Sequence, residues 1–297
     1  LQKTSIDSCE LALSAMVLLQ EFCDKWVMDE FRAQPLGDGR ASKALDGMIL
    51  KWRSWFFEGN ANEHELVQNP VDLELVRSLL EEQHYGILMR DFQEGFDSQR
   101  PGNDRAWKRP NHPGAAEGRL KLLQDFCKQA REKRSFLFSS KNKGVMRVLR
   151  ESYLKLNPIN TTNKNWSDGK IQYDTDGQPK KRPLTDCTAR GDIHAPNYGI
   201  SSFGIVVQQT TSWQAIVWNL LRLEKWYPHI FKVVEREDIS NAFRRIGTHL
   251  RDKGVYAHEF EGIINYTLTL TFGGRASPSA WEAHSSAIEK CYNREPC

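Results

Sequence analysis

The chain has 297 residues, with 41 Lys and Arg against 38 Asp and Glu and a formal net charge of +3 at pH 7. Hydrophobic residues make up 39% of the sequence, which is enough for a core and excludes collagen, coiled coil and wholesale disorder. The longest near-continuous apolar run, Leu11 to Leu19, is far shorter than the ~20 residues of a membrane-spanning helix, so we expect no membrane contact.

The length predicts two structural units, or one elongated domain with an additional helical layer. Six cysteines are scattered along the chain, and no C-x-x-C pair indicates a zinc or redox motif. We therefore expect reduced thiols and an intracellular location, in the cytoplasm or the nucleus. The sequence begins at Leu1 rather than Met, and we expect it to be part of a longer translation.

The first half of the chain is predicted to be mainly helical. Apolar residues recur at helical spacing, and the predicted helices cover residues 6–31, 43–57, 71–83 and 115–133. The polar stretch 98–114, which contains several Pro and Gly residues, predicts a linker.

Positive charge is concentrated between Arg119 and Arg150, where ten Lys and Arg residues stand against Asp125 and Glu132. Such a cluster is typical of a solvated helical face, and it is also the pattern that follows a phosphate backbone.

The second half predicts short strands. The sequence Asp-Thr-Asp-Gly at 174–177 indicates a hairpin turn between strands at 170–173 and 180–184. A helix at 212–225, a strand at 229–235 and a hairpin of strands 254–260 and 263–271 follow, with Glu261 and Gly262 at the turn. Strands joined by hairpins, with helices packed on one side, predict an α+β fold. The absence of Walker A, G-x-G-x-x-G, H-E-x-x-H and G-x-S-x-G phrases argues against the usual NTPases, dehydrogenases, zincins and hydrolases.

Two short motifs near the C-terminal end contain residues suited to binding a metal ion or a ligand. Asp238 ends a predicted strand and passes into a short helical turn, where a carboxylate can bind a hard cation such as Mg²⁺ or cap a helix. In the phrase 270–278, two glycines allow close backbone approach to a ligand, and Ser277 with Pro278 suits the cap and first turn of a helix.

Three phrases, taken in order, resemble a reverse transcriptase. Lys-Lys-Arg-Pro-Leu-Thr-Asp at 180–186 is similar to the fingers, 238–243 to the first catalytic palm motif, and 272–278 to the next. The Phe-Gly-x-x-x-Ser-Pro form is most similar to retrotransposons of the DIRS type. The resemblance covers about residues 70–297. It implies a fingers region at 70–229 and a partial palm at 230–297, after an N-terminal helical region at 1–69.

The resemblance also implies roles for single residues in template-directed nucleotidyl transfer. Asp238 would bind catalytic Mg²⁺, with the Ile239 carbonyl as a second ligand, and two metal ions would stabilise the attacking and leaving oxygens. Phe243 would be the aromatic gate that rejects a 2'-hydroxyl. The remaining implied contacts are to the incoming dNTP: Lys180, Lys181 and Arg182 at the triphosphate, and Phe272, Gly273 and Gly274 at the floor near the nascent pair. The partners implied are an RNA or DNA template–primer and a dNTP.

Two features depart from the family pattern. The polar residues 235–237 precede Asp238 where the family has an apolar strand, and the aromatic-x-Asp-Asp phrase with the second metal ligands does not occur before Cys297. We therefore expect the isolated chain to be inactive. One alternative is a non-catalytic or domesticated nucleic-acid-binding protein that binds through the basic stretch 119–150 and the predicted hairpin at 170–184. Another is a helical protein-interaction module, suggested by the aromatic residues at 52–57.

Overall fold

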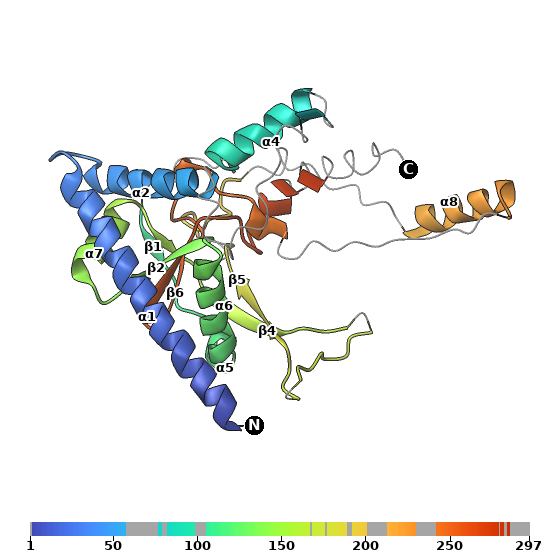
Figure 1. Ribbon diagram of the computed structural model, residues 1–297, viewed down its shortest axis with the longest axis horizontal. Coiled ribbons are helices and arrows are strands. Elements are labelled where there is room, and N and C mark those ends of the chain that lie inside the picture. The colour runs from blue at the N-terminus through green and yellow to red at the C-terminus, as the bar shows by residue number, and fades with distance from the viewer. Residues whose placement is uncertain are drawn as a thin grey trace.

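The computed structural model describes residues 2–57, 77–78, 82–98, 105–166, 168–175, 177–188, 192–200, 213–229, 242–278, 280–281 and 284–285. These residues form a mixed helix and strand structure, in agreement with the predicted α+β class (Figure 1). The helices are α1 (Gln2–Ala33), α2 (Arg40–Phe57), α4 (Glu82–Glu94), α5 (Gly114–Glu117), α6 (Arg119–Arg131), α7 (Lys143–Glu151) and α8 (Trp213–Trp226), with 3-10 turns η2 (Ala242–Arg245) and η3 (Leu250–Asp252). The strands are β1 (Trp107–Lys108), β2 (Ser135–Ser139), β3 (Lys155–Leu156), β4 (Ile159–Asn163), β5 (Lys181–Thr185), β6 (His258–Phe260) and β7 (Ile263–Thr267).

The central sheet is antiparallel and has the order β2-β7-β6. The predicted hairpin at its centre is confirmed, with strands shorter than expected. Glu261 and Gly262 both adopt positive φ, 51° and 83°, as a two-residue turn of this kind requires. Strand β2 comes from the middle of the chain and pairs along the full length of β7, with Leu137 opposite Asn265.

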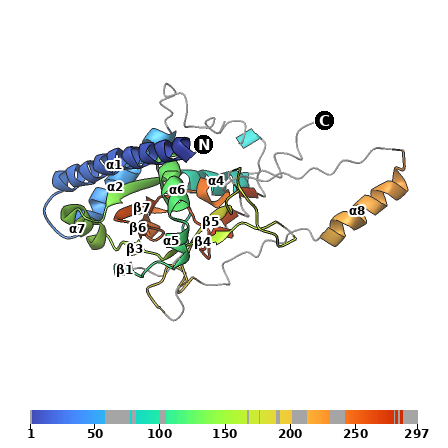
Figure 2. The ribbon, with the colours of Figure 1, turned by 90° about the horizontal axis from the view of Figure 1, so that it is seen from below.

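Helices cover both faces of this sheet, whereas the sequence analysis placed them on one side. Helices α2 and α7 and the C-terminal half of α1 pack on the face that carries Phe136 and Phe138. The other face carries Leu137 and packs against α6 and the N-terminal half of α1 (Figure 2). The one-sided prediction was wrong because consecutive residues of β2 are apolar and buried, and such a strand needs cover on both faces.

The hairpin predicted at 170–184 differs from the prediction in its strand pairing. The predicted turn is present, since the Asp174 amide donates to the Gln178 carbonyl at 2.9 Å. However, β5 pairs with β4, and Arg182 lies opposite Thr162. The expected partner strand at 170–173 forms only isolated bridges, such as Tyr173 with Pro179.

Two other expectations are modified in the region before β2. The single helix predicted at 115–133 is divided at Gly118 into α5 and α6. The chain lies so close to β4 at this break that a Cβ at Gly118 would lie 2.3 Å from the Thr161 hydroxyl oxygen, so the position needs glycine. Part of the expected linker is integrated into the fold, since Trp107 is buried and β1 pairs with β3. Most of the predicted helix at 71–83 and the expected boundary near residue 70 lie outside the described residues. Among the helices described, none combines the length and apolar character needed to span a membrane.

Candidate functional site

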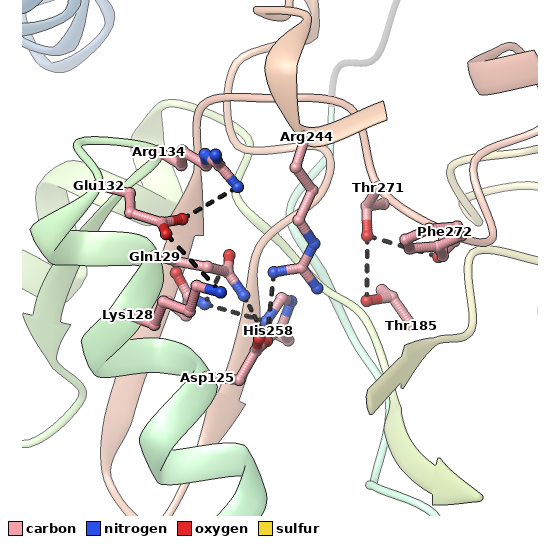
Figure 3. Close-up of polar contacts among 11 residues, drawn as sticks. Asp125, Lys128, Gln129, Glu132, Arg134, Thr185, Arg244, His258, Thr271 and Phe272 are labelled. Atoms are coloured by element: carbon pink, nitrogen blue, oxygen red, sulfur yellow. Dashed lines mark hydrogen bonds and ion pairs between the residues drawn. The ribbon is translucent and has the colours of Figure 1, made fainter. Parts of the chain in front are cut away.

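The last residues of β5, the turn η2 and the loop 271–277 meet at one place, although they are far apart in the sequence. Gly273 has φ +103°, and a Cβ on it would lie 2.1 Å from the Thr185 carbonyl oxygen. The hydroxyl oxygens of Thr271 and Thr185 are 3.4 Å apart (Figure 3). The loop therefore lies directly against the end of β5, and only glycine allows this approach.

An aromatic pair joins η2 to the same loop. The rings of Phe243 and Phe272 have centroids 5.0 Å apart and an interplanar angle of 72°, an edge-to-face contact. Phe243 is half-buried and Phe272 is 38% exposed. The pair thus presents an aromatic surface to solvent beside Gly273, and this arrangement can support a planar ring or a sugar.

Asn197 connects the two sides of this site. Its amide nitrogen donates to the Gly273 carbonyl at 2.7 Å, and its amide oxygen accepts from the Arg275 backbone amide at 2.7 Å. Its own backbone amide donates to the Cys187 carbonyl at 2.9 Å. Asn197 therefore binds the residues after β5 to the glycine loop, and because it is almost fully buried the bonds are shielded from water.

Ser277 closes the loop through its side chain. Its hydroxyl donates to the Thr271 carbonyl at 2.9 Å, and the Gly274 amide points to the same carbonyl at 3.2 Å. Gly274 is buried, and a Cβ there would lie 2.7 Å from the Ser277 hydroxyl oxygen. The Ser277 side chain therefore shapes the loop, and its role as a helix cap stays a prediction, because residue 279 lies outside the described residues.

Lys180, Lys181 and Arg182 make no contact with the aromatic pair in the described part of the chain. Lys180 and Arg182 are exposed, and Lys181 is half-buried with its ammonium 3.7 Å from a Glu117 carboxylate oxygen. Side chains alternate along a strand, so Lys181 shares the face of Thr185 and Arg182 lies on the opposite face. At about 3.3 Å per residue, both cations stand about 10–13 Å along β5 from Thr185, where the glycine loop meets the strand.

The proposed metal ligands are not placed. Asp238 and Ile239 lie outside the described residues. Within the part of the chain that is described, no group of three or more His, Cys, Asp or Glu side chains could hold a metal ion. The expectation of Mg²⁺ therefore rests on the sequence of Asp238 and Ile239 alone.

A buried polar cluster behind η2 was not anticipated from the sequence. Arg244, the residue after Phe243, places a guanidinium nitrogen 3.2 Å from an Asp125 carboxylate oxygen on α6. Gln129 donates to the same carboxylate, and the Asn265 amide nitrogen is 3.3 Å from both the Gln129 oxygen and His258 Nε2 (Figure 3). This network fixes η2 to α6 and so fixes Phe243 from behind.

Electrostatics within this cluster favour a neutral histidine. His258 is fully buried, and desolvation, followed by the nearby Arg244 charge, lowers the pKa of its imidazole from 6.5 to about 4. Asp125 acts in the opposite direction. The cluster therefore has its paired charges at Arg244 and Asp125, with an uncharged imidazole beside them at neutral pH.

The structure thus brings together Phe243, Phe272, Gly273 and Gly274 from the predicted set and adds Thr185, Asn197 and Arg244. Comparisons with protein-family models, with curated proteins and with solved structures returned no match.

Proposed function

We propose that residues 1–297 carry the fingers and the first part of the palm of a retroelement RNA-directed DNA polymerase. The observation that carries the proposal is the convergence of separate motifs. The ends of the phrases at 180–186, 238–243 and 272–278 touch one another, through Gly273 on Thr185 and Phe243 on Phe272. Residues recruited to one site for one ligand must meet in space, and these do so across about 90 residues of sequence.

The proposed roles fit the chemistry of a bound nucleotide. The aromatic pair gives an apolar surface for the sugar and base of a dNTP. Lys181 and Arg182, which lie on opposite faces of β5, are the cations proposed for its triphosphate, and Arg can donate to two oxygens at once. Gly273 and Gly274 let the loop pack against the end of β5, and the exposed Gly273 would contribute backbone to the floor near the nascent pair.

The proposal for these residues is binding and positioning of nucleotide and template, without turnover. Phosphoryl transfer by two metal ions needs carboxylates on both sides of the reacting phosphate. Asp238 would supply one, and residues 1–297 contain no aromatic-x-Asp-Asp phrase to supply the others. Mg²⁺, when bound, would neutralise charge on the triphosphate oxygens. A primer-extension assay on this chain is expected to show no templated synthesis.

The decisive experiment is equilibrium binding of dTTP to the chain on a poly(rA) template with a dideoxy-terminated oligo(dT) primer and Mg²⁺. The correct nucleotide, dTTP, should bind at least about tenfold more tightly than dGTP, a difference of about 1.4 kcal/mol. Equal affinities for dTTP and dGTP would refute template-directed positioning and leave a non-catalytic nucleic-acid-binding protein as the better description.

A matched pair of variants tests the site itself. The double variant Lys181→Gln with Arg182→Gln should weaken dTTP binding about tenfold or more, because two cations next to the triphosphate are lost. The control Lys164→Gln with Lys170→Gln removes the same charge from exposed positions on the same hairpin, and its effect should stay within about twofold. Single variants then assign the loss to Lys181 or to Arg182.

A further inference from the structure

A second basic surface lies on α7, away from the candidate nucleotide site. In both ribbon views α7 lies at one end of the described body, and the finger strands β4 and β5 lie toward the other (Figures 1 and 2). The solvent side of α7 carries Lys143, Arg147 and Arg150, while Val145 and Leu149 are buried in the core. The helix therefore presents a stripe of three cations, which we call the α7 stripe.

Three of the other cations in the basic stretch 119–150 are paired with carboxylates. Arg119 is paired with Glu261 at 2.6 Å, and both Lys128 and Arg134 are within 4 Å of Glu132 carboxylate oxygens. In the α7 stripe, Arg147 pairs with Glu151 at 2.8 Å, but both side chains are largely exposed. An exposed pair one helical turn apart contributes only about 0.3–0.5 kcal/mol, so Arg147 can readily turn to another anion.

The α7 stripe also borders a hollow with room for a ligand. The hollow has a volume of about 350 Å³ and is lined by Ser140, Lys143, Met146, Arg147, Arg150 and Glu151. It combines cations and a hydroxyl with an apolar patch from Met146. Beyond Glu259, which interacts with both Ser140 and Arg150, lies a second hollow whose cations Lys108 and Arg109 are already paired with carboxylates.

We propose that the α7 stripe and its hollow bind the phosphate backbone of single-stranded nucleic acid. A rise of 1.5 Å per residue spreads the three cations over about 10 Å along one side of α7, so each can contact a different phosphate of one strand. The hollow beside them accommodates a base or sugar, with Ser140 as a hydrogen-bonding group. The contact reads charge and spacing rather than sequence, and it requires neither Mg²⁺ nor a dNTP.

Fluorescence anisotropy with a labelled 20-residue oligouridylate tests this proposal on the full chain, in EDTA and at salt concentrations from 50 to 200 mM. With about three phosphate contacts, the logarithm of the association constant should fall with the logarithm of salt concentration with a slope of about −2. Lys143→Gln with Arg150→Gln should weaken binding about 10- to 25-fold near 100 mM salt. The same variant should reduce the magnitude of the slope by about 1.4.

The matched control is Lys121→Gln with Arg131→Gln, which removes two exposed cations from α6 and should change the affinity by less than about twofold. Circular dichroism and the thermal midpoint should be unchanged in both variants, since all four side chains are on the surface. An equal loss of affinity in the two double variants, or no binding by the unmodified chain at 50 mM salt, overturns the proposal.

The α7 proposal and the proposed function can fail separately. Oligouridylate binding in EDTA that depends on Lys143 and Arg150 supports the α7 stripe whether or not dTTP is positioned by a template. Conversely, selective dTTP binding that is unaffected by the α7 variants supports the nucleotide site alone. An oligothymidylate of the same length should bind within about threefold of the RNA, because the phosphates are shared.

Discussion

Replacing Gly273 with Ala tests whether the glycine loop truly lies against the end of β5. An alanine at φ +103° costs about 1–2 kcal/mol in backbone strain. Its Cβ would lie 2.1 Å from the Thr185 carbonyl oxygen, which is rigid backbone, and overpacking of this kind costs about 1–3 kcal/mol. We therefore expect Gly273→Ala to lower the free energy of unfolding by about 2–5 kcal/mol.

The assay is urea unfolding at pH 7.5 followed by tryptophan fluorescence, with Gly247→Ala as the matched control. A Cβ on Gly247 would meet only the Leu268 carbonyl oxygen at 3.9 Å, an ordinary van der Waals distance. The control should therefore change stability by less than about 1 kcal/mol. If Gly273→Ala costs no more than Gly247→Ala, the close approach of the loop to Thr185 is wrong, and so is the convergence on which the nucleotide site rests.

Two further substitutions probe the groups that support this site. The neutral, buried His258 beside Arg244 should destabilise the protein as pH falls from 6.5 toward 4, because the unfolded chain takes up a proton that the native state does not. This residue alone should lower the free energy of unfolding by about 2 kcal/mol between pH 7.5 and 5.0. Urea unfolding should show this loss in the parent protein and not in His258→Gln. An equal dependence of stability on pH in the two proteins would contradict the buried neutral state of His258. Asn197→Ala should cost about 2–3 kcal/mol by the same assay and should also weaken dTTP binding, since the Gly273 carbonyl loses its donor. Unchanged dTTP binding in that variant would show that Asn197 serves stability only.

The parts of the fold that could be predicted are those set by local pattern. Helices α1 and α2 follow from apolar residues at helical spacing, and the β6–β7 hairpin follows from Glu261-Gly262 between two apolar runs. Their existence was foreseen, and their bounds shifted by a few residues. In each case the signal lies within about 30 residues of sequence.

The parts that could not be predicted depend on contacts between distant segments. The pairing of β5 with β4 skips the nearer strand candidate at 170–173, and strand register carries no local signature. The break at Gly118 depends on Thr161, and the cover on both faces of the sheet depends on where α1 lies. Helical spacing of apolar residues does not predict a helix break at a position that packs against a distant strand.

The residues of the candidate site likewise fall into those that a local motif predicts and those that depend on contacts between distant segments. Phe243, Phe272 and the two glycines belong to recognisable phrases, and the structure places them together. Asn197 lies in a polar segment without a motif, and its role emerges only from its bonds to Gly273 and Arg275. Arg244 directly follows a motif, but its buried partner Asp125 belongs to a helix more than 100 residues earlier.

The hydrogen bonds of Asn197 and Arg244 allow an experiment that distinguishes the competing functions better than the sequence motifs do. The glycine loop is tied to β5 through Asn197, and η2 is tied to α6 through Arg244, so damage to either tie should disturb nucleotide positioning. The α7 stripe depends on neither tie, because Lys143, Arg147 and Arg150 stand on a helix anchored in a different part of the core. A polymerase fragment should lose dTTP selectivity when Asn197 is replaced while keeping its affinity for oligouridylate. A non-catalytic nucleic-acid-binding protein should show the oligouridylate binding and no dTTP selectivity at all, so the two measurements on one variant distinguish the two functions.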